Sequence, residues 1–131
     1  MTVVLDASAL LAYWLDETGA NVVAAAVAEH GAMVAAPNLA EALTKLVDRQ
    51  PELGGALPMP LPLAGGAITI EPFSVADAVL CPQVRTQTRG ADLSLGDRAC
   101  LALGQRTGSR VLTADRAWAG LSVGVTVEVI R

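Results

Sequence analysis

The sequence predicts an α/β domain with a central, mostly parallel sheet flanked by helices. Short apolar runs alternate with longer helical segments along the chain, which is the pattern of parallel strands joined by crossover helices. The strand candidates are apolar without alternation, as expected of strands covered on both faces. The chain has 131 residues, the usual size of one domain. We therefore expect a single domain over residues 1–131.

The first half of the chain is expected to form two strands and three helices. The strands are TVVL at residues 2–5 and AMVAAP at 32–37. The helices are SALLAYWL, ANVVAAAVAE and LAEALTKLVDRQ, at residues 8–15, 20–29 and 39–50. Ser8 and Asn38 stand where a polar side chain caps a helix start. The second helix closes at His30 and Gly31, and Pro51 ends the third.

The second half begins with PELGGALPMPLPLAGG, residues 51–66, which holds most of the prolines. This stretch predicts a loop or a broken helix rather than a domain boundary, because too little chain follows for a second domain. Strands are expected at AITIEP, SRVLTA and VTVEVI, residues 67–72, 109–114 and 125–130. Helices are expected at residues 74–88, interrupted or started late by Pro82, at 97–108, and as a short turn at 115–121.

Composition excludes several classes of protein. The chain has only two cysteines, Cys81 and Cys100, without CxxC spacing, so we expect buried free thiols rather than a zinc site. With His30 as the only histidine, Ser-His-Asp and Cys-His mechanisms lack a base. No apolar run reaches the roughly 18 residues of a membrane helix, and no basic leader precedes the first strand. We expect a soluble, cytoplasmic protein without membrane contact.

Four acidic residues stand where the predicted fold would gather them. Asp6 and Asp115 follow the first and fourth strands, Asp97 stands at the start of a helix, and Glu41 lies in the first turn of another. The carboxyl ends of parallel strands, and the helix starts that follow them, meet at one edge of a sheet. Asp92 lies close before Asp97 and is a weaker candidate for the same edge.

Each acid also has an ordinary structural interpretation. Asp6, Asp97 and Asp115 could cap turns or helices, and Glu41 could pair with Lys45 four residues on. Four acids at one edge favour a shared role instead. Clustered carboxylates repel one another unless a cation lies among them, and Mg²⁺ and Mn²⁺ prefer oxygen ligands. Such a site can activate a water molecule and stabilise a phosphodiester under attack.

These segments resemble the PIN-domain ribonucleases, specifically the VapC-type toxins of bacterial toxin–antitoxin pairs. VVLDASALLA is similar to the family's opening strand with its first aspartate, and PNLAEAL to the helix that carries its glutamate. LSLGDRACLALG is the most specific match and holds Asp97 beside Arg98, while VLTADRAW is similar to the segment with the fourth acid. The matches occur in the family's order and extend to the closing VEVIR.

The resemblance implies a PIN domain that is a Mg²⁺- or Mn²⁺-dependent endoribonuclease. In that family pattern, Asp6 and Asp97 are the principal metal ligands, while Glu41 and Asp115 complete the site and orient the attacking water. Ser8 and Thr113 would hold waters or neighbouring oxygens. The family also implies a homodimer and inhibition by a small cognate antitoxin. The prolines Pro58, Pro60 and Pro62 depart from a regular helix, which puts dimer shape and antitoxin fit in question.

The net charge of −4 argues against non-specific binding of nucleic acid. Bound metal and local positive charge can offset it. The C-terminal half contains most of the arginines, among them Arg85, Arg89, Arg98, Arg106, Arg110 and Arg116. Arg98 and Arg116 adjoin candidate metal ligands and are predicted to hold RNA phosphates. Surface solubility and ion pairing are the alternative for the others.

Three other enzyme functions fit the sequence less well than an endoribonuclease. A response-regulator receiver needs a late lysine, a haloacid-dehalogenase-like phosphatase needs a second Asp where the chain has Ser8, and no Walker A or GxGxxG loop is present. The remaining alternative is an inactive binding partner of the same fold, acting through protein–protein contacts. Its surfaces would be AYW, residues 12–14, and ALPMPLPL, residues 56–63.

Overall fold

A computed structural model describes residues 1–57 and 59–131; Pro58 of the proline-rich stretch lies outside the described residues. Five strands form one sheet in the order β3-β2-β1-β4-β5, and all four pairings are parallel. The strands are β1 (Val3–Leu5), β2 (Ala32–Ala35), β3 (Ile68–Glu71), β4 (Val111–Thr113) and β5 (Val127–Val129). The expected α/β domain with a central parallel sheet is confirmed.

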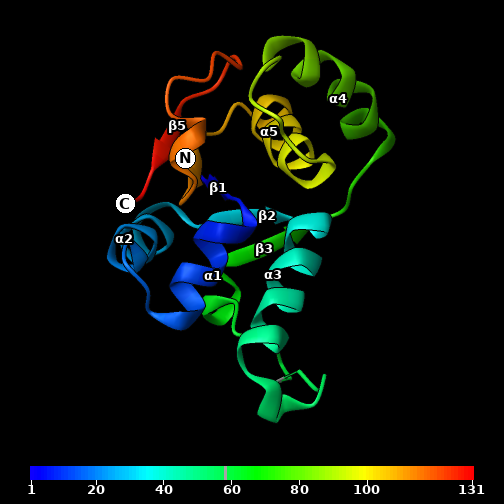
Figure 1. Cartoon of the computed structure of the whole chain (residues 1–131). Coiled ribbons are helices and arrows are strands. Elements are labelled where there is room, and N and C mark those ends of the chain that lie inside the picture. The colour runs from blue at the N-terminus through cyan, green and yellow to red at the C-terminus, as the bar shows by residue number, and fades with distance from the viewer. Residues whose placement is uncertain (58) are drawn as a thin grey trace.

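Helices cover both faces of the sheet (Figure 1). One side carries α1 (Ala7–Leu15), α2 (Ala20–His30) and α3 (Ala36–Arg49). The other side carries α4 (Val75–Gln87) and α5 (Leu95–Thr107), which pack side by side. Three short 3₁₀ turns complete the described elements, at Pro51–Leu53, Ala64–Gly66 and Arg116–Trp118.

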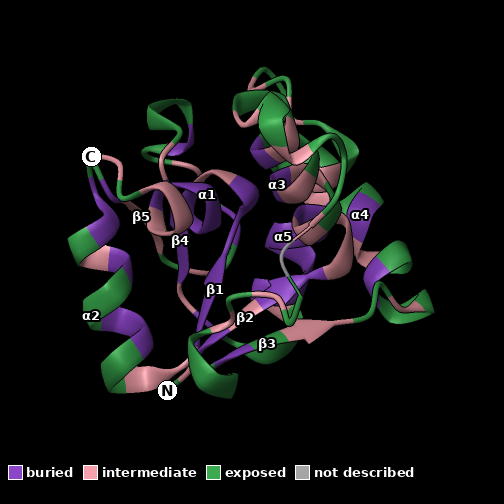
Figure 2. Ribbon diagram, turned by 90° about the horizontal axis from the view of Figure 1, so that it is seen from below, coloured by how far each residue is buried: buried purple, intermediate pink, exposed green. Residues whose placement is uncertain are grey.

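Alternate residues of β1 serve the two cores. Val3 and Leu5 pack with α1, α2 and α3, whereas Val4 packs with α5 and Trp118 on the opposite face. Figure 2 shows β1, β4 and the inner sides of the helices as mainly buried and β5 as intermediate, while exposed residues lie on the outer sides of α2 and α4. This burial on both faces explains why β1 is apolar without alternation. Among the described residues, no helix is long and apolar enough to cross a membrane.

Several expected helix boundaries were wrong. α1 begins at Ala7 and is capped by Asp6 rather than by Ser8. α3 begins at Ala36, so that Asn38 lies inside it instead of capping it, and Glu41 lies in its second turn. Pro82 is accommodated within α4, which continues without a break to Gln87. α5 begins two residues before Asp97, because Ser94 is its cap.

Candidate active site

The first acid, Asp6, is buried at the carboxyl end of β1. Its side chain is 5% exposed and also caps α1 by accepting a hydrogen bond from the backbone of Ala9 at 2.8 Å. The hydroxyls of Ser8 and Thr113 donate to its two oxygens at 2.7 and 2.5 Å. Burial raises the pKa of Asp6 despite these three hydrogen bonds, and the negative charge of Asp97 adds to the rise. The Asp6 carboxylate is therefore held in a fixed position, and burial makes its ionised form less favourable.

Ser8 and Thr113 link Asp6 to the end of β4. The Ser8 hydroxyl accepts a hydrogen bond from the backbone of Ala114 at 2.9 Å, and the Thr113 hydroxyl accepts one from the backbone of Asp115 at 3.0 Å. Both hydroxyls therefore orient Asp6 directly and tie the β1 and β4 edges together.

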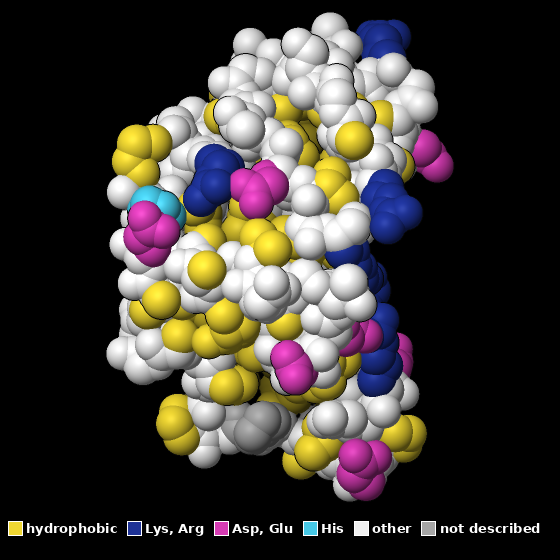
Figure 3. Space-filling view, turned by 90° about the vertical axis from the view of Figure 1, so that its left-hand side faces the viewer, with side chains coloured by type: hydrophobic (Ala, Val, Ile, Leu, Met, Phe, Trp, Pro, Cys, Tyr) yellow, Lys and Arg dark blue, Asp and Glu magenta, His cyan; other side chains and the backbone are white. Residues whose placement is uncertain are grey.

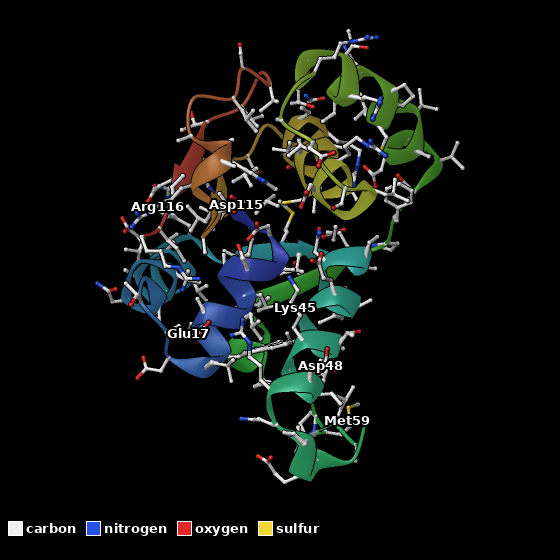
Figure 4. All side chains as sticks on the ribbon, in the orientation of Figure 1. Glu17, Lys45, Asp48, Met59, Asp115 and Arg116 are labelled. Atoms are coloured by element: carbon white, nitrogen blue, oxygen red, sulfur yellow. The ribbon has the colours of Figure 1, made fainter. Side chains whose placement is uncertain are left out.

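Asp97 and Glu41 approach each other across the start of α5. Asp97 accepts a hydrogen bond from the Ser94 backbone at 2.9 Å and returns one from its own backbone to the Ser94 hydroxyl, which forms a capping box. Glu41 pairs with Lys45 at 3.1 Å through one oxygen. Its other oxygen lies so close to Gly96 that a Cβ there would stand 3.3 Å from it. Figure 4 shows Lys45 between α3 and α1, where its side chain is exposed.

Three of the four predicted acids, Asp6, Glu41 and Asp97, lie within electrostatic range of Cys100. This thiol is fully buried, and burial together with the negative charges of Asp6, Asp97 and Glu41 raises its pKa well above the ordinary value. We call these three residues the acid site. These acids also have the ordinary structural roles that the sequence allowed. Asp6 caps α1, Asp97 completes the capping box of α5, and Glu41 pairs with Lys45. The capping role and the convergence therefore coexist.

Asp115 lies at the rim of this arrangement. It is exposed and caps the 3₁₀ turn by accepting a hydrogen bond from the backbone of Ala117 at 2.9 Å. Figure 4 shows it beside the start of α1, while Arg116 lies farther toward the C-terminus. Its connection to Asp6 runs through Thr113, which bonds to both residues. Asp92, the weaker candidate, lies on the α4 side of α5 near Arg98.

The donors of the acid site suit a hard divalent cation. Carboxylate oxygens are the ligands that Mg²⁺ and Mn²⁺ prefer, and the repulsion between Asp6 and Asp97 is what such a cation relieves. Over residues 1–57 and 59–131, no three Asp, Glu, His or Cys side chains already stand together at metal-binding distances. Binding would thus require Asp97 or Glu41 to turn from its present partner, or a water molecule to bridge.

The arginines of the C-terminal half divide into distinct groups. Arg106 and Arg110 form ion pairs with Asp77 and Glu128, at 2.6 and 2.7 Å. Arg116 donates to the backbone carbonyl of Arg131. Arg98 lies near Cys81 of α4, where its positive charge opposes the rise in the pKa of that thiol caused by burial. Cys81 and Cys100 are both free and buried, as predicted.

Asn38 also belongs to this region, although the sequence predicts for it only the role of a helix cap. It is 1% exposed, and its amide donates a 2.9 Å hydrogen bond to the carbonyl of Gly96, which joins α3 to the first turn of α5. Its own oxygen has no protein partner. Its position three residues before Glu41, on the same side of a helix, was the available signal.

Comparison with known proteins agrees with this architecture. The family model for the PIN domain matches residues 3–123. A search of curated protein sequences finds no match. Among solved structures, a toxin–antitoxin complex from Klebsiella pneumoniae gives a TM-score of 0.71 at 17% identity and covers 99% of this chain and 98% of that one.

Two further solved structures share the fold. VapBC2 from Rickettsia felis, bound to a DNA fragment from its promoter, has a TM-score of 0.68 at 12% identity, with 98% of each chain covered. VapC20 of Mycobacterium tuberculosis, a toxin that cleaves the sarcin–ricin loop, has a TM-score of 0.65 at 14% identity, with 95% of this chain and 99% of that one covered. At these identities the likeness is one of fold.

Proposed function

The chain belongs to the PIN-domain family, and on that premise we propose that it is a metal-dependent endoribonuclease toxin of the VapC type. It would cleave structured cellular RNA and be inhibited by a cognate antitoxin. The observation that carries the proposal is the placement of Asp6 at the carboxyl end of β1 and of Glu41 against the first turn of α5, which carries Asp97. That edge is where parallel α/β folds bind ligands.

In this proposal the buried carboxylate and its neighbour hold Mg²⁺ or Mn²⁺. Asp6 and Asp97 are the main ligands, and Asp115 at the rim completes the set. When bound, the ion supplies Lewis-acid stabilisation of the negative charge that builds up on the phosphodiester. Asp6 is suited to this role because the Ser8 and Thr113 hydroxyls fix its orientation.

Glu41 is the residue we assign to the attacking water. Its free oxygen faces the start of α5, beside Asp97, and a carboxylate there can accept a hydrogen bond from water and hold it for attack. In the hydrolysis the water oxygen forms a new bond to phosphorus, the bridging P–O bond breaks, and the departing oxygen receives a proton. Lys45 pairs with the other oxygen of Glu41 at 3.1 Å, which leaves one carboxylate oxygen for the water.

The RNA would be held by arginines next to the acids. Arg98 follows Asp97 directly, and Arg116 follows Asp115. A guanidinium can hold a phosphate through two parallel hydrogen bonds. Although the net charge is −4, the Lys and Arg side chains visible in Figure 3 gather mainly along one edge of the molecule. Local positive charge of this kind is sufficient for binding a short stretch of RNA.

The comparisons also support a protein partner. The structure from Klebsiella is a toxin–antitoxin complex, and we propose that this chain is likewise inhibited by a cognate antitoxin and forms a homodimer. Exposed apolar residues are available for such contacts, since Val75 and Val79 on one face of α4 are 82% and 70% exposed.

The direct test is cleavage of a structured RNA by the purified protein. We expect cleavage with Mn²⁺ or Mg²⁺, none in EDTA, and a loss of at least about 100-fold for Asp97→Asn, as for removal of a principal charge-stabilising group. Asp48→Asn, a change at a solvent-facing acid on α3 (Figure 4), is the matched control and should cleave like wild type. Equal cleavage by Asp97→Asn and wild type would overturn the proposal.

The second candidate is an inactive PIN-fold binding partner. The AYW segment no longer supports it, because Ala12 is buried and Trp14 packs on the core and donates a hydrogen bond to the Pro62 carbonyl. The exposed Met59 within ALPMPLPL still does. A wild-type protein that binds no Mn²⁺ and cleaves no RNA would favour this candidate.

A further inference from the structure

A basic pocket lies beside the acid site, on the other side of α5. It is a cavity of about 360 Å³ between the end of α4, the loop after it and the first turn of α5. Three arginines line it, namely Arg85, Arg89 and Arg98, together with Asp92. We call these four residues the arginine pocket. Figure 1 shows α4 and α5 side by side, joined by the loop that closes this end.

Within the part of the chain that the structure describes, the three guanidinium groups have no acidic partner. Over residues 1–57 and 59–131, none of them has a carboxylate oxygen within 4.0 Å, whereas Arg49, Arg106 and Arg110 each have one. Asp92 shares the cavity but forms no ion pair with them. The pocket therefore holds an excess of positive charge in a protein whose net charge is negative. Clustered like charges are costly unless an anion binds among them.

Packing of α4 on α5 does not need these arginines. At the far end of the helix pair, Asp77 pairs with Arg106 at 2.6 Å. Nearer the pocket, Gln105 donates a hydrogen bond to Gln87 at 2.8 Å. The side chains of Arg85 and Arg89 are exposed and make no hydrogen bond within the described residues. Their clustering in one cavity thus lacks a structural explanation within the fold, while a bound anion would explain it.

We propose that the arginine pocket binds a non-scissile phosphodiester of the RNA whose scissile group lies at the acid site. The inference rests on the proposed ribonuclease function and deepens it. Guanidinium groups match phosphate oxygens in charge and geometry. An RNA strand offers such groups at every nucleotide, so one strand can occupy both sites.

The first turn of α5 connects the two sites. Asp97 and Arg98 are consecutive, and consecutive side chains of a helix diverge by about 100°. The charge of Asp97 acts on Asp6, whereas Arg98 lines the cavity beside the end of α4. A strand that crosses the N-terminal end of α5 would place one phosphate on the acid side and a neighbouring phosphate on the arginine side. The pocket would then set the register of the RNA.

The test measures RNA binding without cleavage. Binding of a fluorescein-labelled single-stranded RNA is followed by anisotropy in EDTA, at several NaCl concentrations, for wild type, Arg85→Gln/Arg89→Gln and Arg49→Gln. Arg49→Gln is the matched control, since it removes one surface charge from the far end of α3 (Figure 1). Two RNAs of unrelated sequence are compared, because phosphate contacts act on both alike.

We expect the double variant to bind both RNAs about 10-fold more weakly at low salt, with a salt dependence of log Kd lower by about 0.7, the value for one lost phosphate contact on a single strand. Affinity equal to that of Arg49→Gln, or a loss confined to one RNA, would overturn the inference and leave the proposed function standing. Wild type that binds neither RNA would overturn both. Adding Mn²⁺ gives a second readout, in which KM should rise more than kcat falls.

Discussion

Replacing Asn38 by alanine should separate the stability of the protein from the geometry of its acid site. The Asn38 amide donates a hydrogen bond to the carbonyl of Gly96, which joins α3 to the first turn of α5. Glu41 lies one turn after it on α3, and Asp97 follows Gly96 on α5. Without this bond, α3 and the first turn of α5 lose a side-chain hydrogen bond next to Glu41 and Asp97.

The structure sets the size of the stability change. The lost hydrogen bond, 2.9 Å long and buried, contributes about 1 kcal/mol. The small cavity left by the side chain costs roughly another 1 kcal/mol. Removing the Asn38 oxygen, which has no protein partner, returns part of this, about 1 kcal/mol. The net loss is about 1 kcal/mol, which corresponds to a fall in Tm of about 3–5 °C for a domain of this size.

Activity should fall much further, by about 10- to 100-fold in kcat, because small misplacements of catalytic groups have effects of that order. The assays are thermal unfolding followed by circular dichroism and Mn²⁺-dependent RNA cleavage, with the concentration of Mn²⁺ at half-maximal rate as a further readout. Asn21→Ala, on the exposed surface of α2, is the control. If Asn38→Ala loses stability but keeps the wild-type rate and Mn²⁺ requirement, Asn38 has no positioning role.

Three other substitutions have defined outcomes. Asp6→Asn should abolish cleavage without lowering the free energy of unfolding in EDTA at pH 7. Burial raises the folded pKa of Asp6, so wild type loses stability as the pH rises through that pKa. In urea denaturation, the stability of the variant relative to wild type should therefore be greater at about pH 7 than at about pH 4. An opposite trend with pH would contradict this. Asp77→Asn should lower the free energy of unfolding by about 1–2 kcal/mol at neutral pH, less than a fully buried pair because Arg106 is partly exposed. Burial alone would raise the pKa of Asp77, but the hydrogen bonds from Arg106 and from its own helix cap outweigh burial and lower the pKa. The stability difference between wild type and Asp77→Asn should therefore fade as the pH falls through the folded pKa. A stability difference that persists in acid would count against the pairing. Gly104→Ala should destabilise the protein by about 1–3 kcal/mol in thermal unfolding, since its Cβ would stand 2.7 Å from Cγ2 of Val111; a variant as stable as wild type would refute that clash.

Much of the fold could be predicted because its signals are local. The apolar run before Asp6 is covered on both faces by helices, and this double coverage removes the alternation that a half-exposed strand would show. The helix starts were harder. Asp6 and Ser8 are both good caps, and which of them is used depends on where the strand ends.

The candidate site could be predicted only in part, since convergence depends on tertiary packing. The parallel order of the strands carries Asp6, Glu41 and Asp97 to one edge, as expected, but Asp115 turns to cap its own 3₁₀ turn at the rim. Asn38 was assigned to a cap because no local pattern reveals a hydrogen bond to a residue 58 positions away. The shared cavity of Arg85, Arg89 and Arg98 likewise arises only when α4 folds against α5.

The most direct test of the central claim is calorimetric titration of Mn²⁺ into the purified protein, with Asp97→Asn and Asp48→Asn alongside. Our account predicts saturable binding to wild type and to Asp48→Asn, at least 10-fold weaker binding to Asp97→Asn, and a wild-type protein stabilised by about 2.7 kcal/mol when Mn²⁺ exceeds Kd about 100-fold. If wild type takes up no Mn²⁺, or Asp97→Asn binds it as tightly as wild type, then the acids at the sheet edge do not form a metal centre.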